Sequence, residues 1–152
     1  MKNLILFIFF ICNNLCFSQN NDDIRDIFFN KKINIEKCDS IENNIDKIKI
    51  TCNTMYAYCG ANYFMYCNFT KNVFDKFKYF KKGKEILEEA LAKEPNNLEI
   101  KFLRYINQIN TPWFLNYKQN INEDYSFIIS NIEMIRSEKL KNQIIATIKE
   151  YK

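Results

Sequence analysis

The sequence predicts an all-α protein, and three observations support this prediction. Apolar residues recur every three or four positions along most of the chain, a spacing that places them on one face of a helix. The 152 residues include only 2 Gly and 2 Pro, too few for the turns of a multi-stranded sheet. The 14 Phe and 9 Tyr provide enough large side chains for the core of one domain. We therefore expect five to seven helices arranged in antiparallel hairpins.

The N-terminus has the features of an export signal. Lys2 precedes an unbroken apolar run at positions 4–12, and small residues stand at the −3 and −1 positions before Gln19. We predict a signal peptide over 1–18 and a single helical domain over 19–152, exported to the periplasm or secreted. The alternative is a membrane anchor, but a spanning helix needs about 20 apolar residues and two asparagines interrupt this run earlier. No membrane span is expected after cleavage.

The first three predicted helices are identified by their apolar stripes. The segments 22–30 and 35–48 each place apolar residues on one face, and the segment 51–68 is rich in Tyr, Met and Cys. Because this third segment has few charged residues on any face, we expect it to be the central buried helix. Gly60 lies in its interior, where glycine costs about 1 kcal/mol relative to alanine. A close crossing with another helix would explain this glycine, and local flexibility is the alternative.

The last four predicted helices are identified mainly by the residues at their ends. The segment 75–93 combines an apolar face with a charged face at helical spacing, and Pro95 ends it. Each later helix begins at a residue type that commonly caps helix N-termini. The predicted caps and helices are Asn96 before 97–110, Asn120 at the start of 120–134, and Ser137 at the start of 137–149.

One segment resembles the second helix of a tetratricopeptide repeat. Phe80, Gly83, Leu87, Ala90 and Pro95 match that repeat's pattern of large, small and helix-ending residues. The resemblance implies a tetratricopeptide-like stack, in which the small residues let neighbouring helices approach closely. The helix before this segment departs from the repeat pattern, and no second copy with the same spacing is present.

A broader resemblance covers about half of the predicted domain. The segments 79–83, 102–105, 112–115 and 120–124 are similar to an uncharacterised family of small exported bacterial proteins. This resemblance implies a helical architecture and a periplasmic or secreted location. It implies no activity.

Several classes of function are excluded by composition. Without histidine, the chain cannot form Ser-His-Asp or Cys-His nucleophile pairs, and it lacks the commonest transition-metal ligand. Two glycines cannot form a Gly-rich phosphate loop. The net charge of +4, with basic and acidic residues interleaved, is too small to indicate a nucleic-acid partner. We expect no cofactor and no metal.

Four cysteines remain after the predicted cleavage. Pairs within the third helix are about 10 Å apart along its axis, farther than the roughly 7 Å that a disulfide can span. A single bridge from Cys38 to one of Cys52, Cys59 or Cys67 is feasible in an oxidising compartment. The alternatives are four small buried apolar side chains or a thiol-redox function. No close C-x-x-C pair is present to bind zinc.

The best candidate for a binding surface is the aromatic connector, residues 113–117, between the fifth and sixth helices. Trp113, Phe114 and Tyr117 lie there, and Arg104 and Tyr105 precede it in sequence. Aromatic rings and arginine are the side chains that dominate binding hot spots. The alternative is that Pro112 directs the rings inward, where they close the end of the helix stack.

These observations favour a non-enzymatic interaction or scaffold module of the cell envelope with a protein partner. The alternative is a small envelope hydrolase that uses paired carboxylates, for which acidic residues cluster at 85–89 (Glu85, Glu88 and Glu89) and at 22–26 (Asp22, Asp23 and Asp26). Because Glu85 and Glu89 lie opposite the apolar stripe of their helix, a solvated helix face is the favoured interpretation of the first cluster.

Overall fold

The computed structural model describes residues 24–26, 28–30 and 35–151. The chain divides into two compact units, with the boundary between Asn34 and Ile35. In the N-terminal unit, residues 24–26 and 28–29 are helical, within the predicted helix 22–30. The predicted signal peptide and its cleavage site lie outside the described residues.

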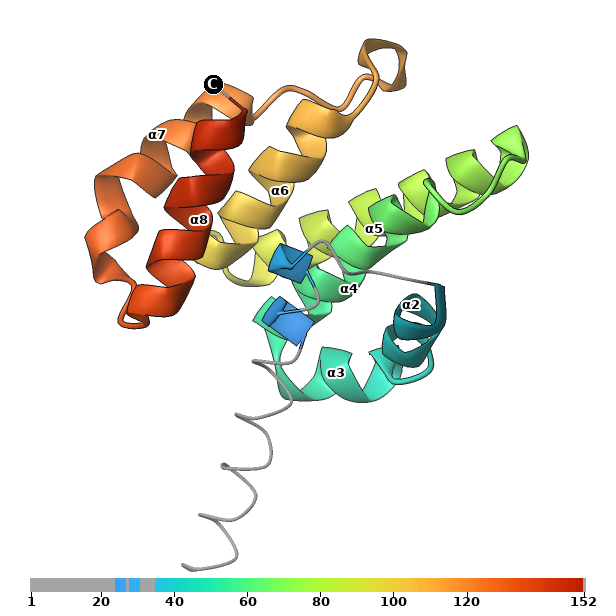
Figure 1. Ribbon diagram of the computed structural model, residues 1–152, viewed down its shortest axis with the longest axis horizontal. Helices are drawn as coiled ribbons and strands as arrows, with labels where there is room; N and C mark the ends of the chain where they lie inside the picture. Colours follow the sequence, from blue (N-terminus) through green and yellow to red (C-terminus); the bar gives the residue numbers. More distant parts are fainter. Residues whose placement is uncertain (1–23, 27, 31–34, 152) are drawn as a thin grey trace, which may run out of the picture. The chain divides into compact units, whose positions relative to one another are not determined.

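The described part of the chain contains helices and no strand, which confirms the predicted all-α class. Figure 1 shows the larger unit as a series of helices joined by short loops. Its elements are α2 (Ile35–Glu42), α3 (Ile45–Thr51), α4 (Asn53–Tyr66), α5 (Val73–Lys93), α6 (Leu98–Asn110), η1 (Trp113–Leu115), α7 (Ile121–Asn131), η2 (Ile132–Met134) and α8 (Glu138–Glu150). No described helix is both long and apolar enough to cross a bilayer.

Helix α4 is the centre of this unit, as its scarcity of charged residues predicts. Ten of its residues are buried, among them Met55, Tyr58 and Tyr63. It pairs with α5, and it also contacts α2, α3 and α6. Because α4 is enclosed by neighbours on several sides, almost every position of the helix carries an apolar or small residue.

The two glycines of the chain meet where α4 and α5 cross. A β-carbon on Gly83 would lie 2.8 Å from the carbonyl oxygen of Gly60 and 2.8 Å from a ring carbon of Phe64. A β-carbon on Gly60 would lie 3.0–3.1 Å from Ile86, Leu87 and the carbonyl oxygen of Gly83. The close crossing explains both glycines, so Gly60 has a packing role.

Helix α6 follows the α4–α5 hairpin and packs against both of its helices, and α7 then packs on α6. Helix α8 buries Leu140, Ile144 and Ile148. The contacts from α4 through α7 join helices that follow one another in the chain, as in successive hairpins. The tetratricopeptide-like form of the stack remains a prediction.

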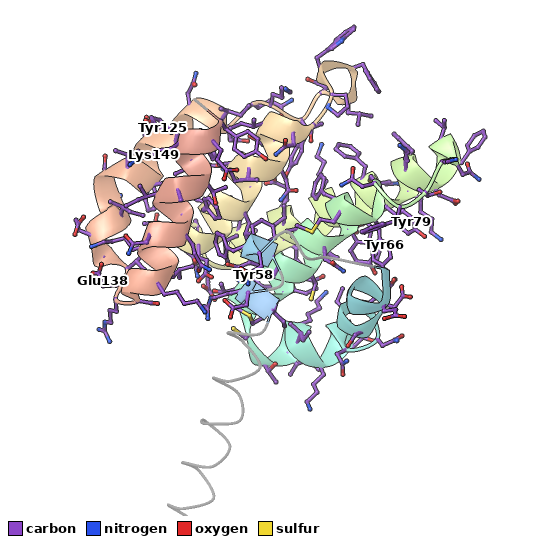
Figure 2. The ribbon with its side chains drawn as sticks, in the orientation of Figure 1. Tyr58, Tyr66, Tyr79, Tyr125, Glu138 and Lys149 are labelled. Atoms are coloured by element: carbon purple, nitrogen blue, oxygen red, sulfur yellow. The ribbon has the colours of Figure 1, made fainter. Side chains whose placement is uncertain are left out.

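Helix α2 is attached to the hairpin by tyrosines. The Tyr63 hydroxyl donates to Glu42 Oε1 at 2.5 Å, and the Tyr66 hydroxyl donates to Asp39 Oδ1 at 2.6 Å. The ring of Tyr66 also stacks on Tyr79 of α5 at 5.1 Å between centroids, and Figure 2 shows these two side chains next to each other. Each tyrosine therefore packs its ring and hydrogen-bonds its hydroxyl.

The prediction of one continuous helix over 35–48 is wrong. The chain turns at Asn43 and Asn44, which separate α2 from α3. The Asn44 side-chain amide donates to the carbonyl of Ser40 at 2.8 Å, a local hydrogen bond of the kind that competes with helix continuation. Cys52, in an extended conformation, then separates α3 from α4, so the predicted helix 51–68 starts later than expected.

The predicted caps have different outcomes. Ser137 caps α8, since its hydroxyl oxygen accepts from the Leu140 amide at 3.3 Å. Asn120 precedes α7 but accepts no capping hydrogen bond. The cap of α6 is Asn97 and not Asn96, because Asn97 Oδ1 accepts from two backbone amides, Glu99 at 3.0 Å and Ile100 at 3.2 Å.

Candidate binding surface at the aromatic connector

The connector has a fixed backbone conformation. It forms the short 3-10 helix η1, in which the Leu115 amide donates to the carbonyl of Pro112 at 3.1 Å. Asn116 ends it in the left-handed region at φ 47°, which Asn adopts more readily than most residues. The Gln119 side chain donates to the Asn116 carbonyl at 2.8 Å. These contacts define the direction in which the aromatic side chains leave the chain.

The structure separates the five predicted binding residues into two groups. Trp113 and Phe114 are 83% and 66% exposed, and their rings meet edge to face with centroids 6.1 Å apart. Arg104, Tyr105 and Tyr117 are buried. Tyr117 is turned inward, as one interpretation predicts, while Trp113 and Phe114 face solvent, as the other predicts.

Tyr117 attaches the connector to the α4–α5 hairpin. Its ring stacks on Phe64 at 6.1 Å and meets Phe80 edge to face at 6.0 Å. The Lys84 ammonium lies 5.0 Å from the ring centroid, and the hydroxyl donates to Glu88 Oε1 at 2.7 Å. Burial raises the pKa of Tyr117, so its hydroxyl remains a hydrogen-bond donor at neutral pH.

Beneath the connector, Arg104 and Asp124 form a buried ion pair. Arg104 Nε donates to Asp124 Oδ2 at 2.7 Å and Nη2 donates to Oδ1 at 2.8 Å, a bidentate arrangement. Arg104 is 6% exposed and Asp124 is fully buried. Arg104 also donates to Glu88 Oε2 at 3.1 Å, and Glu88 is the carboxylate that Tyr117 binds. One set of contacts therefore joins α5, α6, α7 and the connector.

Lys101 extends this ionic network. Its ammonium lies 3.3 Å from Asp124 Oδ1 and 3.1 Å from Glu123 Oε1. Although burial lowers the pKa of Arg104, its hydrogen bonds to Asp124 and Glu88 outweigh this effect and raise the pKa above its ordinary value. The Arg104 guanidinium therefore stays charged at neutral pH between its two carboxylate partners.

The sequence interpretation did not identify Glu88, Asp124 and Lys101 as members of this network. Glu88 was assigned to a solvated helix face, and Asp124 stands in the first turn of α7, where acids are common for other reasons. A usable signal was present in α6. Lys101 and Arg104 interrupt an otherwise apolar run, and buried cations require acidic partners.

The carboxylates proposed for hydrolysis point to different partners. Glu88 binds Arg104 and Tyr117, whereas Glu89 accepts from Lys93, Lys49 and Tyr56. The hydrogen bonds from Lys93, Lys49 and Tyr56 lower the pKa of Glu89 to about 2. A general acid needs the opposite shift, toward neutrality. The geometry of these two residues therefore does not favour an acid pair.

Cys52, Cys59 and Cys67 carry free thiols. Burial raises the pKa of the Cys59 thiol to about 12, which suppresses the reactive thiolate. Cys67 Sγ donates to backbone carbonyls of Tyr63 and Lys76. Because these three thiols are unbridged, the structure does not contain the predicted bridge from Cys38, whose own side chain lies outside the described residues. Among the described residues, no group of three potential ligands could hold a metal ion.

Comparison of the chain with protein-family models, with curated proteins and with solved structures found no match. The two resemblances in sequence therefore carry no family assignment.

Proposed function

We propose that this chain is a non-catalytic binding module of the cell envelope that presents Trp113 and Phe114 to a partner. The observation that carries the proposal is the exposure of these two rings, 83% and 66%, on a connector whose base is fixed. Large rings that are exposed on a rigid support bind without a large loss of conformational entropy. Export of the chain, predicted from its N-terminus, is part of the proposal.

The buried residues support the same function. Tyr117 is fixed between Phe64, Phe80 and Glu88, and Arg104 is fixed by two carboxylates. These contacts determine where residues 113 and 114 emerge. Their role is positioning, because their own side chains are not accessible to a partner.

The single Trp of the chain offers a direct test. We expect Trp113 emission to shift to shorter wavelength, and acrylamide quenching to fall, when the full chain is mixed with envelope material from the cells that make it. Contact with a partner removes the indole ring from water, which causes both changes.

A relocated Trp provides the matched control. The double variant Trp113→Phe with Met134→Trp places the indole at another exposed position, since Met134 is 75% exposed. Its emission should stay unchanged. An equal shift at both positions, or no shift at 113, would overturn the proposed function.

A further inference from the structure

A second exposed group of side chains lies at the end of the α4–α5 hairpin. Phe74 and Phe77 are 85% and 58% exposed in the first two turns of α5, and Val73 beside them is 74% exposed. The exposed lysines Lys71, Lys76, Lys78 and Lys81 surround these rings. We call these two phenylalanines and four lysines the aromatic-basic tip.

The tip has a strongly positive charge. Residues 71–84 contain six lysines and one acid, a net charge of +5, whereas the whole chain carries +4. Residues 85–99 contain five glutamates and one lysine. In the part of the chain that the structure describes, none of the four tip lysines is in an ion pair. Their charge is therefore available to an external anionic surface.

The rings and the lysines are ordered along the helix. With a rise of about 1.5 Å per residue, Lys78 lies about 6 Å and Lys81 about 10 Å behind Phe74 along the axis. Phe74, Phe77, Lys78 and Lys81 fall within one sector of about 100° around α5. Within this sector the two rings lie nearer the start of α5 than Lys78 and Lys81, the order in which an interfacial segment meets acyl chains and then headgroups. Lys71 precedes both rings and Lys76 lies between them in sequence, so these two lysines contribute charge but do not share this order.

The connector is attached near this tip. Tyr117 contacts Phe80, one turn of α5 beyond Phe77, and Trp113 and Phe114 are four and three residues before Tyr117. Figure 1 shows the connector and the α4–α5 loop both projecting beyond the packed parts of the helices. Trp and other aromatic residues prefer the membrane–water interface, so the connector adds to the same chemistry.

We propose that the aromatic-basic tip and the connector dock this protein on an anionic lipid membrane, with the rings in the interface and the lysines at the headgroups. The inference rests on the proposed function and names the partner. Charge complementarity, and the position of Phe74 and Phe77 ahead of Lys78 and Lys81 along α5, favour a bilayer over an acidic protein, whose surface would not require that order.

The test uses the full chain, vesicles of phosphatidylglycerol, and vesicles of phosphatidylcholine. We expect Trp113 emission to shift and to be quenched by lipids with a spin label near the headgroup in phosphatidylglycerol vesicles, and not in phosphatidylcholine vesicles. Because Trp113 is the only Trp, its emission reports on the connector alone. The apolar run at positions 4–12 is present in every variant, so it cannot cause a difference in binding between them.

Two variants test the two components. Lys78→Glu with Lys81→Glu should weaken binding by at least about 25-fold, because each lysine near an anionic surface contributes about fivefold. Phe74→Ser with Phe77→Ser should weaken it by about tenfold or more, since both rings lose their place in the interface. All four positions are exposed, so the fold should be retained, as circular dichroism will show. Lys149→Glu and Met134→Ser, also at exposed positions, are the matched controls and should bind like the unaltered chain.

Failure of the inference can be told apart from failure of the proposed function. A Trp113 shift with the soluble fraction of the envelope, but none with phosphatidylglycerol vesicles, would overturn the membrane inference and leave the binding module standing. Absence of a shift with either would overturn both. Equal binding of the tip variants and the controls would also overturn the membrane inference.

Discussion

Asn97 shows how one residue can fix both the start of a helix and its position. Its side-chain oxygen accepts from the amides of Glu99 and Ile100, while its side-chain nitrogen donates to Thr54 Oγ1 at 2.9 Å and to Glu94 Oε2 at 2.6 Å. The first pair of bonds caps α6. The bond to Thr54 joins that cap to α4, so the start of α6 has a defined place on the central helix.

Replacement of this residue tests the cap. We expect Asn97→Ala to lower the free energy of unfolding by about 1–2 kcal/mol, because two amides of α6 lose their acceptor. Asn96→Ala is the control, since Asn96 is exposed and should change the free energy by less than about 0.5 kcal/mol. Urea denaturation measures both. A larger loss for Asn96→Ala would show that the cap is Asn96, as the sequence pattern alone suggested.

At the scale of single elements, two glycines allow the close crossing of α4 and α5. Backbone faces backbone at Gly60 and Gly83, and the carbonyl oxygen of Gly60 occupies the space that a β-carbon on Gly83 would need. The two helices can pack this closely only because neither residue has a side chain. The crossing in turn sets where Phe64 and Phe80 meet Tyr117.

Alanine substitution at the two glycines should have unequal effects. Gly83→Ala places its β-carbon 2.8 Å from backbone and ring atoms, so we expect a loss of about 1–3 kcal/mol in unfolding free energy despite the better helix propensity of alanine. Gly60→Ala meets mostly flexible side chains at 3.0–3.1 Å and should lose less. Thermal and urea unfolding of both variants checks the order. A Gly83→Ala protein as stable as the unaltered chain would contradict the close crossing.

The elements were more predictable from sequence than their contacts. The helical class, the central position of α4 and the cap at Ser137 follow from local patterns of three to seven residues, and the structure has all three. The break at Asn43 and Asn44 was missed because two asparagines in a row are compatible with a helix until their side chains bind the backbone. The tip at Phe74 and Phe77 was missed because apolar periodicity identifies a helix face but not which turns of it extend beyond the partner helix.

The candidate site was also only partly predictable from sequence, because it depends on contacts between residues that lie far apart in the chain. The sequence pattern singles out Trp113, Phe114, Tyr117 and Arg104, but does not divide them into exposed and buried groups. That division depends on Glu88 and Asp124, which lie 16 and 20 positions from Arg104 and are brought to it by the fold. Pairings at that distance in sequence have no periodic signature.

At the scale of the larger unit, the ion pairs and hydrogen bonds around Arg104 hold α5, α6, α7 and the connector together. We expect Asp124→Asn to lower the free energy of unfolding by about 3–5 kcal/mol, because Arg104 and Lys101 then lose the buried carboxylate that they share. Glu123→Gln is the matched control at the next position. Its side chain is 64% exposed, so loss of its bond to Lys101 should cost less than about 1 kcal/mol.

The same pair of variants separates stability from function. With Asp124→Asn, the base of the connector loosens, and we expect faster amide exchange over 113–117 under conditions where the protein is still folded. Glu123→Gln should leave that exchange unchanged. Asp124→Asn could instead destabilise the protein but leave amide exchange in the connector equal to that of the control. In that case Arg104 and Asp124 would stabilise only the general core, and Tyr117 alone would position the exposed rings.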